Sequence, residues 1–299
     1  NGWELSVSWN DKINNVGGSP LMYSIGVGLA DSYSTITKFD NPEGALNNYS
    51  EGKRIGEIWG YVTDGFIQDE AEAQRLATIQ GDISKTWKVG DIRYKDLDGV
   101  EGITPAKTIY NTGDKKVIGN TTPRYSFNIN ASASWKGFDV RVFFEGIAKR
   151  DLWIDSPVFW GFPSNSNVWQ SAVNDYHVDN SWSENNTNAY YPLPSYSGRS
   201  KQTQTKYLQN GAYIRLKDLT ISYTIPKAWI STVGIEQLKV FASGQNLWVG
   251  TKLFKYLDPD IVSTRQSNSK DNKLVGNLTS DGKAYPYSRT FSFGINLTF

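Results

Sequence analysis

The feature that most constrains this chain is a strict alternation of apolar and polar residues in several long segments. Residues 291–299 read FSFGINLTF, with a large apolar side chain at every odd position and a small or polar one at every even position. A period of two places the two sets on opposite faces of a β-strand. One face of this expected strand is wholly apolar and comprises Phe291, Phe293, Ile295, Leu297 and Phe299.

Six other segments show the same pattern, the last of them more weakly. They are residues 3–9, 21–29, 125–135, 138–144, 219–225 and 236–247. Lys136 and Gly137 separate two of these segments, and this spacing predicts a tight turn between paired strands. The polar face of each segment is rich in Ser, Thr, Asn and Gly, which suits a water-filled lumen better than a packed core.

The connections between these segments are alternately short and long along the chain. In an up-and-down antiparallel sheet, all short turns then lie at one end and all long loops at the other, as in outer-membrane barrels. The sequence therefore predicts an all-β fold, namely part of an antiparallel up-and-down transmembrane β-barrel. The expected external loops cover residues of about 38–122, 151–210 and 249–284, and residues 68–79 predict a short helix within the first.

A secreted β-sandwich that binds or cleaves polysaccharide is the alternative, because its strands also alternate. Several segments here run past ten residues, whereas strands of globular proteins usually have about 5–6. The two folds differ in where the apolar face points, which is outward to lipid in a barrel and inward to a second sheet in a sandwich. No segment approaches the roughly 20 apolar residues of a membrane helix. The chain starts as a strand without an initiator Met or signal peptide, so we expect a segment of a longer protein.

Composition excludes several functional classes. The chain has no cysteine and one histidine, His177, which rules out thiolate chemistry and multi-histidine metal sites. The formal net charge of +1 gives no reason to expect nucleic-acid binding. Asp258 and Asp260 flank a proline, which favours a turn over a catalytic pair, and we expect no special chemistry from His177. With no phosphate loop or nucleophile elbow, we expect no enzyme.

Several motifs together resemble the C-terminal part of the SusC/RagA-type TonB-dependent outer-membrane transporters of Bacteroidetes, in the family's order. They are NGWELSVSW at 1–9, RIGEIWGYVTDGFIQ at 54–68, GDIRYKDLDG at 90–99, VIGNTTPRYSFNINASASWKGFDVRVFFEG at 117–146, GAYIRLKDLTISYTIP at 211–226, FASGQNLW at 241–248 and YPYSRTFSFGINLTF at 285–299. The resemblance covers essentially the whole chain.

This resemblance implies a barrel of roughly 22 strands with a plugged lumen, of which this chain would supply about 7–9 strands. The plug and the N-terminal strands would lie outside residues 1–299, and the remainder of the same barrel would close the sheet. The implied function is TonB-dependent import of a large nutrient, most often an oligosaccharide and sometimes a peptide. The implied partners are a SusD-like surface lipoprotein, TonB–ExbB–ExbD acting through the plug, and the lipid of the bacterial outer membrane.

An acidic segment from residue 96 to 114 resembles a degenerate calcium loop. Calcium takes six to eight oxygen ligands, and Asp96, Asp98, Glu101 and Asp114 could supply carboxylates around the turn at Gly99. Relative to the family pattern D-x-[DN]-G-D-G-x-I, one residue is inserted, because Val100 and Glu101 stand where the pattern has one Asp. A structural calcium is therefore one interpretation, and a solvated acidic turn is the other.

The loop at residues 151–210 is unusually aromatic. Such side chains could stack on the apolar faces of sugar rings or contact a partner, or they could pack the loop against itself. The candidates for contact with substrate or partner are Trp153, Phe159, Trp160, Trp169, Tyr176, Trp182, Tyr190 and Tyr191.

The final strand resembles the C-terminal signal read by the barrel-assembly machinery. Phe299 ends the chain, and apolar residues occupy every second position before it, back to Phe291. The alternative interpretation is a strand that simply ends the chain.

Overall fold

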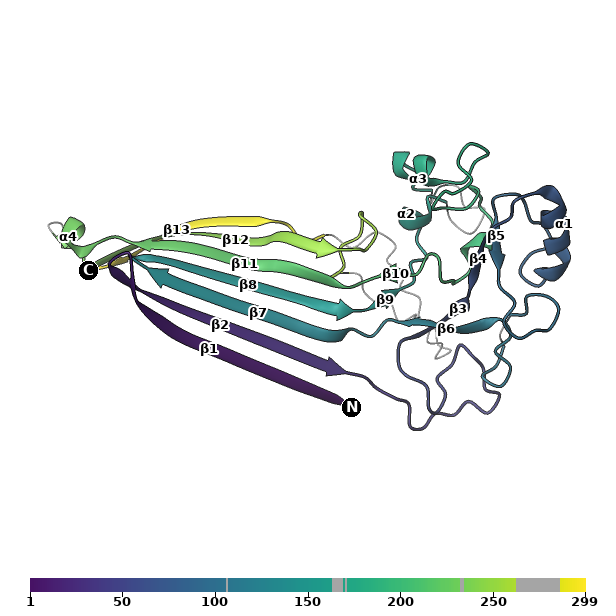
Figure 1. Ribbon diagram of the computed structural model, residues 1–299, viewed down its shortest axis with the longest axis horizontal. Coiled ribbons are helices and arrows are strands. Elements are labelled where there is room, and N and C mark those ends of the chain that lie inside the picture. The colour runs from purple at the N-terminus through teal and green to yellow at the C-terminus, as the bar shows by residue number, and fades with distance from the viewer. Residues whose placement is uncertain (106, 163–168, 170, 232–233, 262–285) are drawn as a thin grey trace.

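The computed structural model describes residues 1–299 except 106, 163–168, 170, 232–233 and 262–285. Its main element is one antiparallel sheet of seven long strands in the order β1-β2-β7-β8-β11-β12-β13 (Figure 1). Their bounds are β1 (Gly2–Val16), β2 (Ser19–Ser32), β7 (Arg124–Trp135), β8 (Phe138–Lys149), β11 (Tyr213–Thr224), β12 (Gln237–Thr251) and β13 (Thr290–Thr298). Each strand pairs with the next long strand along the chain, so the predicted up-and-down all-β fold is confirmed.

Two of the strand connections are two-residue turns of the kind that the twist of a hairpin favours. Gly17 and Gly18 join β1 to β2, with φ of 59° and 85°. Lys136 and Gly137 join β7 to β8, with φ of 49° and 85°. Positive φ at both central residues is typical of a type I′ turn, which glycine adopts without steric cost. The prediction of a tight turn at Lys136-Gly137 is therefore confirmed.

Most strands are longer than the alternating segments in the sequence. The first alternating segment covers residues 3–9, but β1 continues to Val16. It pairs with β2 in one register as far as Ile13 opposite Leu21 and, beyond a bulge, at Val16 opposite Ser19. The polar residues at this end break the apolar alternation without breaking the ladder. Pairing depends on backbone hydrogen bonds, which residues of any polarity can make.

The register aligns the apolar side chains of neighbouring strands into rows across the sheet. One row runs from Val7 through Val27, Ile129, Phe144 and Leu216 to Trp248. This face is open in the part of the chain that the structure describes, and Phe293 is 82% exposed. The apolar face thus meets no second sheet among the described residues, which overturns the sandwich alternative.

The described parts of the long loops between the strands gather at one end of the sheet and form an outer loop region; residues 262–284 of the predicted loop at 249–284 lie outside the described residues (Figure 1). It contains three two-stranded sheets that the sequence pattern did not predict, because strands of two to six residues are too short to show a period. These pairs are β3 (Glu57–Tyr61) with β6 (Lys115–Asn120), β4 (Thr63–Phe66) with β5 (Ile92–Tyr94), and β9 (Asp151–Leu152) with β10 (Gln209–Asn210).

Helices are few and short. The predicted helix at 68–79 is confirmed as α1 (Glu70–Ile79), where the Asp69 carboxylate caps the N-terminus by accepting from the Glu72 amide at 2.7 Å. The other described helices are α2 (Pro157–Trp160), α3 (Asp175–Asn180), the 3₁₀ turn η2 (Arg199–Lys201), and α4 (Lys227–Ile230) at the opposite end of the sheet. None of the described helices has the length and apolar character needed to cross a bilayer.

A cluster of ionic contacts ties the loop after β12 to the wall. Arg215 of β11 is almost fully buried and pairs with Asp258, while Lys217 contacts Asp260 at 2.7 Å and Glu145 at 2.8 Å. The register with β8 shifts between Leu216 and Asp218, so Lys217 is the extra residue of a bulge. Asp258 and Asp260 are thus anchoring residues. The sequence favoured a turn over a catalytic pair here, but it did not identify the cations that they bind.

A charge on the lipid-facing side should disturb insertion far more than the same charge on the polar side. In the complete protein, we expect Ile25→Arg to destabilise the folded barrel by about 2–4 kcal/mol if the site lies near the bilayer centre. Asn130→Arg is the matched control, because Asn130 pairs with Gly26 at nearly the same height and lies on the opposite face. The measurement is the folded fraction of each variant, read from heat-modifiable gel migration in increasing urea. An equal loss of folded protein in both variants would contradict the assignment of the two faces.

Candidate functional site

The outer loop region holds the hydrophobic core of the described chain, whereas the long sheet has no core of its own. Its centre is an aromatic cluster drawn from α2, the following loop and the segment after β12. Phe159 lies edge-on to Trp160 at a centroid distance of 5.1 Å, to Phe254 at 5.2 Å and to Tyr191 at 5.6 Å. Such edge-to-face pairs are the favoured aromatic geometry and fix the rings relative to one another.

Most of the aromatic candidates from the sequence lie inside this core. Trp153, Phe159, Trp160, Trp182 and Tyr191 are buried. Burial on this scale favours the alternative that they pack the loop region, and it removes them from direct contact with a ligand in this conformation. Contact with substrate or partner therefore stays a prediction only for the remaining three candidates. Tyr176 and Tyr190 are half-buried, and Trp169 is 92% exposed.

Tyr207 completes the aromatic core, and the sequence did not predict this role, because one tyrosine at the edge of a loop carries no pattern. Its ring stacks parallel to that of Tyr191 at 6.2 Å, and it is fully buried. Burial raises the pKa of the Tyr207 hydroxyl far above its ordinary value, so the side chain stays neutral. The core is thus a rigid uncharged platform under the outer surface.

His177 has a structural role that the sequence did not indicate. It is buried in α3, and its Nδ1 accepts from the Asn174 amide at 3.3 Å to complete a capping box. Its Nε2 lies 3.1 Å from the Phe159 carbonyl, which joins α3 to α2. Burial lowers the pKa of His177 below its usual value, so the ring is neutral near pH 7.

A buried polar network joins two loops that are far apart in the sequence. The Asp91 carboxylate accepts from the Arg199 guanidinium at 2.5 Å and from the Ser200 hydroxyl at 2.9 Å. The Tyr94 hydroxyl donates to the Arg199 carbonyl at 2.7 Å. Asp91 is fully buried, so the arginine and hydroxyl partners are what make its burial tolerable. The first two long loops therefore form one unit.

Three of the four predicted calcium ligands come together in the structure. Oxygens of Asp96, Asp98 and Asp114 all lie within 4.8 Å of one another, and Glu101 is not part of this group. Asp114 is buried, and its carboxylate accepts from the amides of Leu97 at 2.5 Å and Thr104 at 2.7 Å. The cluster thus has the donor atoms that calcium prefers, on a loop held in shape by backbone hydrogen bonds.

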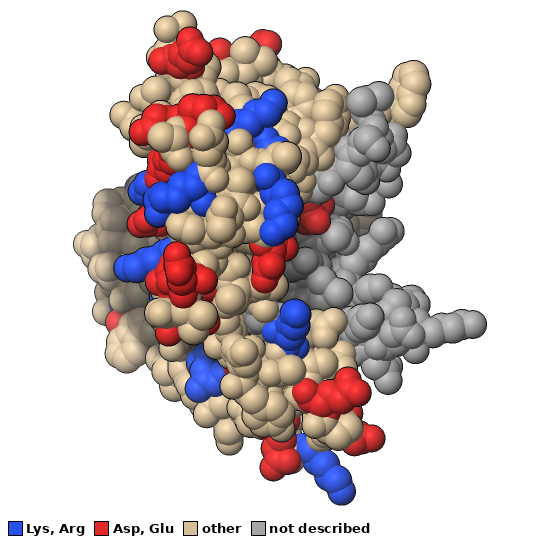
Figure 2. Space-filling model, turned by 90° about the vertical axis from the view of Figure 1, so that its right-hand side faces the viewer, with Lys and Arg blue, Asp and Glu red and all other residues tan. Residues whose placement is uncertain are grey.

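The outermost face of the molecule carries charges of both signs. Figure 2 views the outer loop region from outside and shows acidic and basic side chains interspersed over this face, with neither sign dominating. The outer loop region also contains ion pairs, such as Arg93 with Glu72 at 2.5 Å and with Asp64 at 3.0 Å. A face of this kind suits a protein or a polar ligand and gives no steering toward a polyanion.

Comparison with known proteins identifies the sheet. No family model matches the chain. The chain is 30% identical over 249 residues to TonB-dependent receptor P3 of Formosa agariphila, covering 83% of this chain, and 26% identical over 243 residues to TonB-dependent receptor P26 of the same organism, covering 78%. The chain corresponds to part of the barrel of a TonB-dependent receptor. It spans only about a fifth of the length of these relatives, 22% and 21%.

Solved structures of the RagAB peptide importer have the same fold. The open-open state superposes with a TM-score of 0.65 at 19% identity, and a structure of the RagAB peptide transporter with 0.64 at 19% identity. All of this chain is covered in both, against 28% and 29% of those chains. TonB-dependent receptors are outer-membrane proteins, and the bacterial outer membrane is the location of this chain.

The residues of the expected barrel-assembly signal lie on β13 and just beyond it. Phe291, Phe293 and Ile295 alternate along the exposed apolar face, and Leu297 and Phe299 follow in the same phase. β13 is an edge strand of the sheet, paired with β12. Recognition of this strand by the assembly machinery stays a prediction.

Truncating a buried ring should loosen the outer loop region, whereas truncating the exposed one should not. We expect Phe159→Ala to destabilise this region by about 3–5 kcal/mol, because it leaves a cavity among packed rings. Trp169→Ala is the control, since its side chain is exposed. The measurement is hydrogen exchange of the outer loop region in the complete receptor; unchanged protection in Phe159→Ala would contradict the packing role.

Proposed function

We propose that this chain is part of a TonB-dependent importer that carries large nutrients across the outer membrane. The observation that supports this proposal most directly is the long sheet, which has one exposed apolar face and one polar face. In hydrocarbon such a sheet must be closed, because unpaired edges leave backbone groups without partners. The outer edges of β1 and β13 have no strand partner among the described residues, and the remainder of a barrel of roughly 22 strands would pair with them.

The chain would act by holding and releasing cargo and would form no covalent bond with it. The polar face of the sheet would line the lumen, and the outer loop region would form one wall of the binding chamber. A SusD-like lipoprotein would close over the mixed-charge outer face as a lid. TonB, driven by ExbB and ExbD, would pull a plug that the remainder of the barrel encloses. The aromatic core and the Asp91–Arg199 network would keep the wall rigid while the lid and plug move.

An oligosaccharide is the cargo that we favour, from the resemblance to SusC-type transporters. A peptide is the second candidate, because the solved structures of similar fold are described as a peptide importer and a peptide transporter. Both ligands need amide, hydroxyl and aromatic groups, so the composition of the loops does not separate them.

Import should depend on the complete receptor and on TonB. We expect a host strain that carries the complete receptor and its lipoprotein to take up a labelled oligosaccharide, and to lose uptake when TonB is deleted, because the plug can then no longer be moved. The measurement is cell-associated label over time.

A strain with a deletion of residues 151–210 should retain the barrel in the membrane yet lose binding of the labelled oligosaccharide. Uptake that persists without TonB would contradict the proposal. Uptake of a labelled peptide, without uptake of the oligosaccharide, would identify a peptide as the cargo.

We propose further that Asp96, Asp98 and Asp114 hold a structural calcium ion. Three carboxylates within 4.8 Å repel one another, and a divalent cation would remove that repulsion. Among the ion pairs of the described residues, none involves these three acids, so no lysine or arginine neutralises them. The ion would fix the turn at Gly99 against β6 and thereby stiffen the first long loop.

Removing one carboxylate should remove the ion. In Asp98→Asn we expect calcium affinity to fall by about tenfold or more, since one charged ligand is lost from a small set. Asp82→Asn in the same loop is a control, because Asp82 lies outside the acidic cluster. Calorimetric titration of the purified receptor with Ca²⁺ after chelator treatment measures the affinity. A wild-type receptor that binds no calcium would leave the solvated acidic turn as the correct interpretation.

A further inference from the structure

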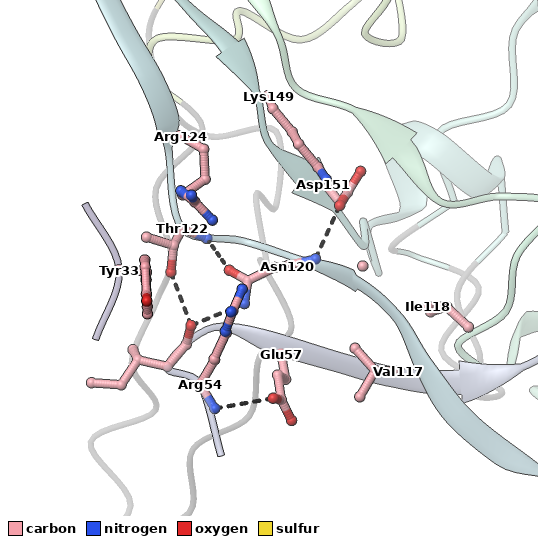
Figure 3. Close-up of a pocket in the computed structure, with 12 residues that line it drawn as sticks. Tyr33, Arg54, Glu57, Val117, Ile118, Asn120, Thr122, Arg124, Lys149 and Asp151 are labelled. Carbon is pink, nitrogen blue, oxygen red and sulfur yellow. Dashed lines mark hydrogen bonds between the residues drawn. The ribbon is translucent and has the colours of Figure 1, made fainter. Parts of the chain in front are cut away.

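A cavity of about 330 Å³ lies where the wall strands pass into the outer loop region (Figure 3). Its lining comes from the segment after β2, from β3 and β6, and from the outer ends of β7 and β8. The volume is at the low end of the range for small-molecule sites, which suits a single unit of a larger ligand. The wall residues that line the cavity belong to β7 and β8, the third and fourth strands of the sheet, so strands that pair with the outer edges of β1 and β13 would not replace them.

The neutral polar groups of the cavity bind one another. The Ile55 carbonyl accepts from the Asn120 amide group at 3.1 Å and from the Thr122 hydroxyl at 3.0 Å. The side-chain oxygen of Asn120 accepts from the backbone N–H of Thr122 at 2.8 Å. The backbone N–H of Asn120 donates to Asp151 Oδ2 at 3.0 Å. These bonds, drawn in Figure 3, fix the walls and leave these groups few free donors or acceptors for a ligand.

The positive side chains of the cavity differ from this pattern, because two of the three have no anionic partner. Arg124 is paired with Asp31. The guanidinium of Arg54 lies over the Tyr33 ring at 4.5 Å and makes no ion pair or side-chain hydrogen bond with any described residue. The ammonium group of Lys149 has no partner in the described part of the chain. Lys149 lies directly opposite Arg124 in the β7–β8 register, and Arg54 lines the same cavity from the segment before β3.

The acidic side chains that line the cavity, Glu57 and Asp151, form no ion pair with these cations among the described residues. Glu57 accepts from the Arg54 amide at 3.0 Å through one oxygen and from the Trp59 indole at 3.2 Å through the other. Asp151 uses Oδ2 for Asn120, which leaves Oδ1 without a donor among the described residues. The cavity therefore presents two free cationic donors and one free carboxylate acceptor.

We propose that this cavity is a subsite for one carboxylate-bearing sugar unit of an oligosaccharide cargo, an inference that rests on the proposed function. A guanidinium matches the two oxygens of a carboxylate, and the Lys149 ammonium adds a second charge-assisted contact. Asp151 Oδ1 accepts a hydroxyl of the same ring. A uronic acid unit carries a carboxylate and ring hydroxyls within one sugar, whereas a neutral sugar leaves both cations unpaired.

The test compares an acidic and a neutral oligosaccharide on the complete receptor with its lipoprotein partner in detergent. We expect tetragalacturonate to bind more tightly than galactotetraose. Lys149→Gln and Arg54→Gln should each weaken tetragalacturonate binding by roughly tenfold, because each removes a charge-assisted contact, and should change galactotetraose binding by less than about twofold. Lys12→Gln is the matched control, because Lys12 lies near the turn at the other end of the wall. Calorimetry gives the affinities.

Each other outcome contradicts a specific part of the inference. If galactotetraose bound as tightly as tetragalacturonate, and both variants bound tetragalacturonate like the wild type, the acidic subsite would be overturned. The proposed import function would not be affected by that result. Binding of an acidic tetrapeptide instead of either sugar, weakened in Lys149→Gln, would overturn the assignment to a sugar. A receptor that binds no oligosaccharide and no peptide would overturn the proposed function, and this inference with it.

Discussion

The structure depends above all on the pairing of backbone groups along seven long strands whose outer face lies against hydrocarbon. Lipid supplies no hydrogen bonds, so each amide and carbonyl in the wall must find its partner on a neighbouring strand. The five strands between β1 and β13 are paired on both sides within this sheet, whereas β1 and β13 each have one outer edge that the remainder of the barrel would pair with. The apolar side chains therefore lie outward in rows such as Val7, Val27 and Ile129, and not in a core between sheets.

A second consequence of this arrangement is that tertiary packing concentrates outside the membrane. A single sheet has no interior of its own, so the aromatic core, the buried ion pair of Asp91 with Arg199 and the small sheets lie in the outer loop region. Loops of this length would otherwise lose much conformational entropy on binding a ligand. Packing around Phe159 and capping of α3 by Asn174 fix them beforehand.

The fold was largely predictable, because one face of each wall strand is apolar and the other polar. Alternation located all seven long strands, and the turn at Lys136-Gly137 followed from residue type. Strand ends were predicted less well, because residues such as Asn10 and Asp11 pair through their backbone and carry no apolar signal. The short pairs such as β4 with β5 were not predictable, since a strand of three or four residues has no measurable period.

The sequence by itself determined the class of the protein: long alternating segments, alternately short and long connections and a set of family motifs indicate a barrel wall with outer loops. Only the tertiary structure decided what the loop residues do. The same aromatic side chains could have faced a ligand or one another, and burial assigned Trp153 and Trp160 to the core. Likewise, Lys149 and Arg54 are ordinary cations in the sequence, and their common cavity appears only when segments about 95 residues apart are brought together. Local periodicity is set by neighbours in the chain, whereas burial and charge pairing depend on distant residues that no local pattern encodes.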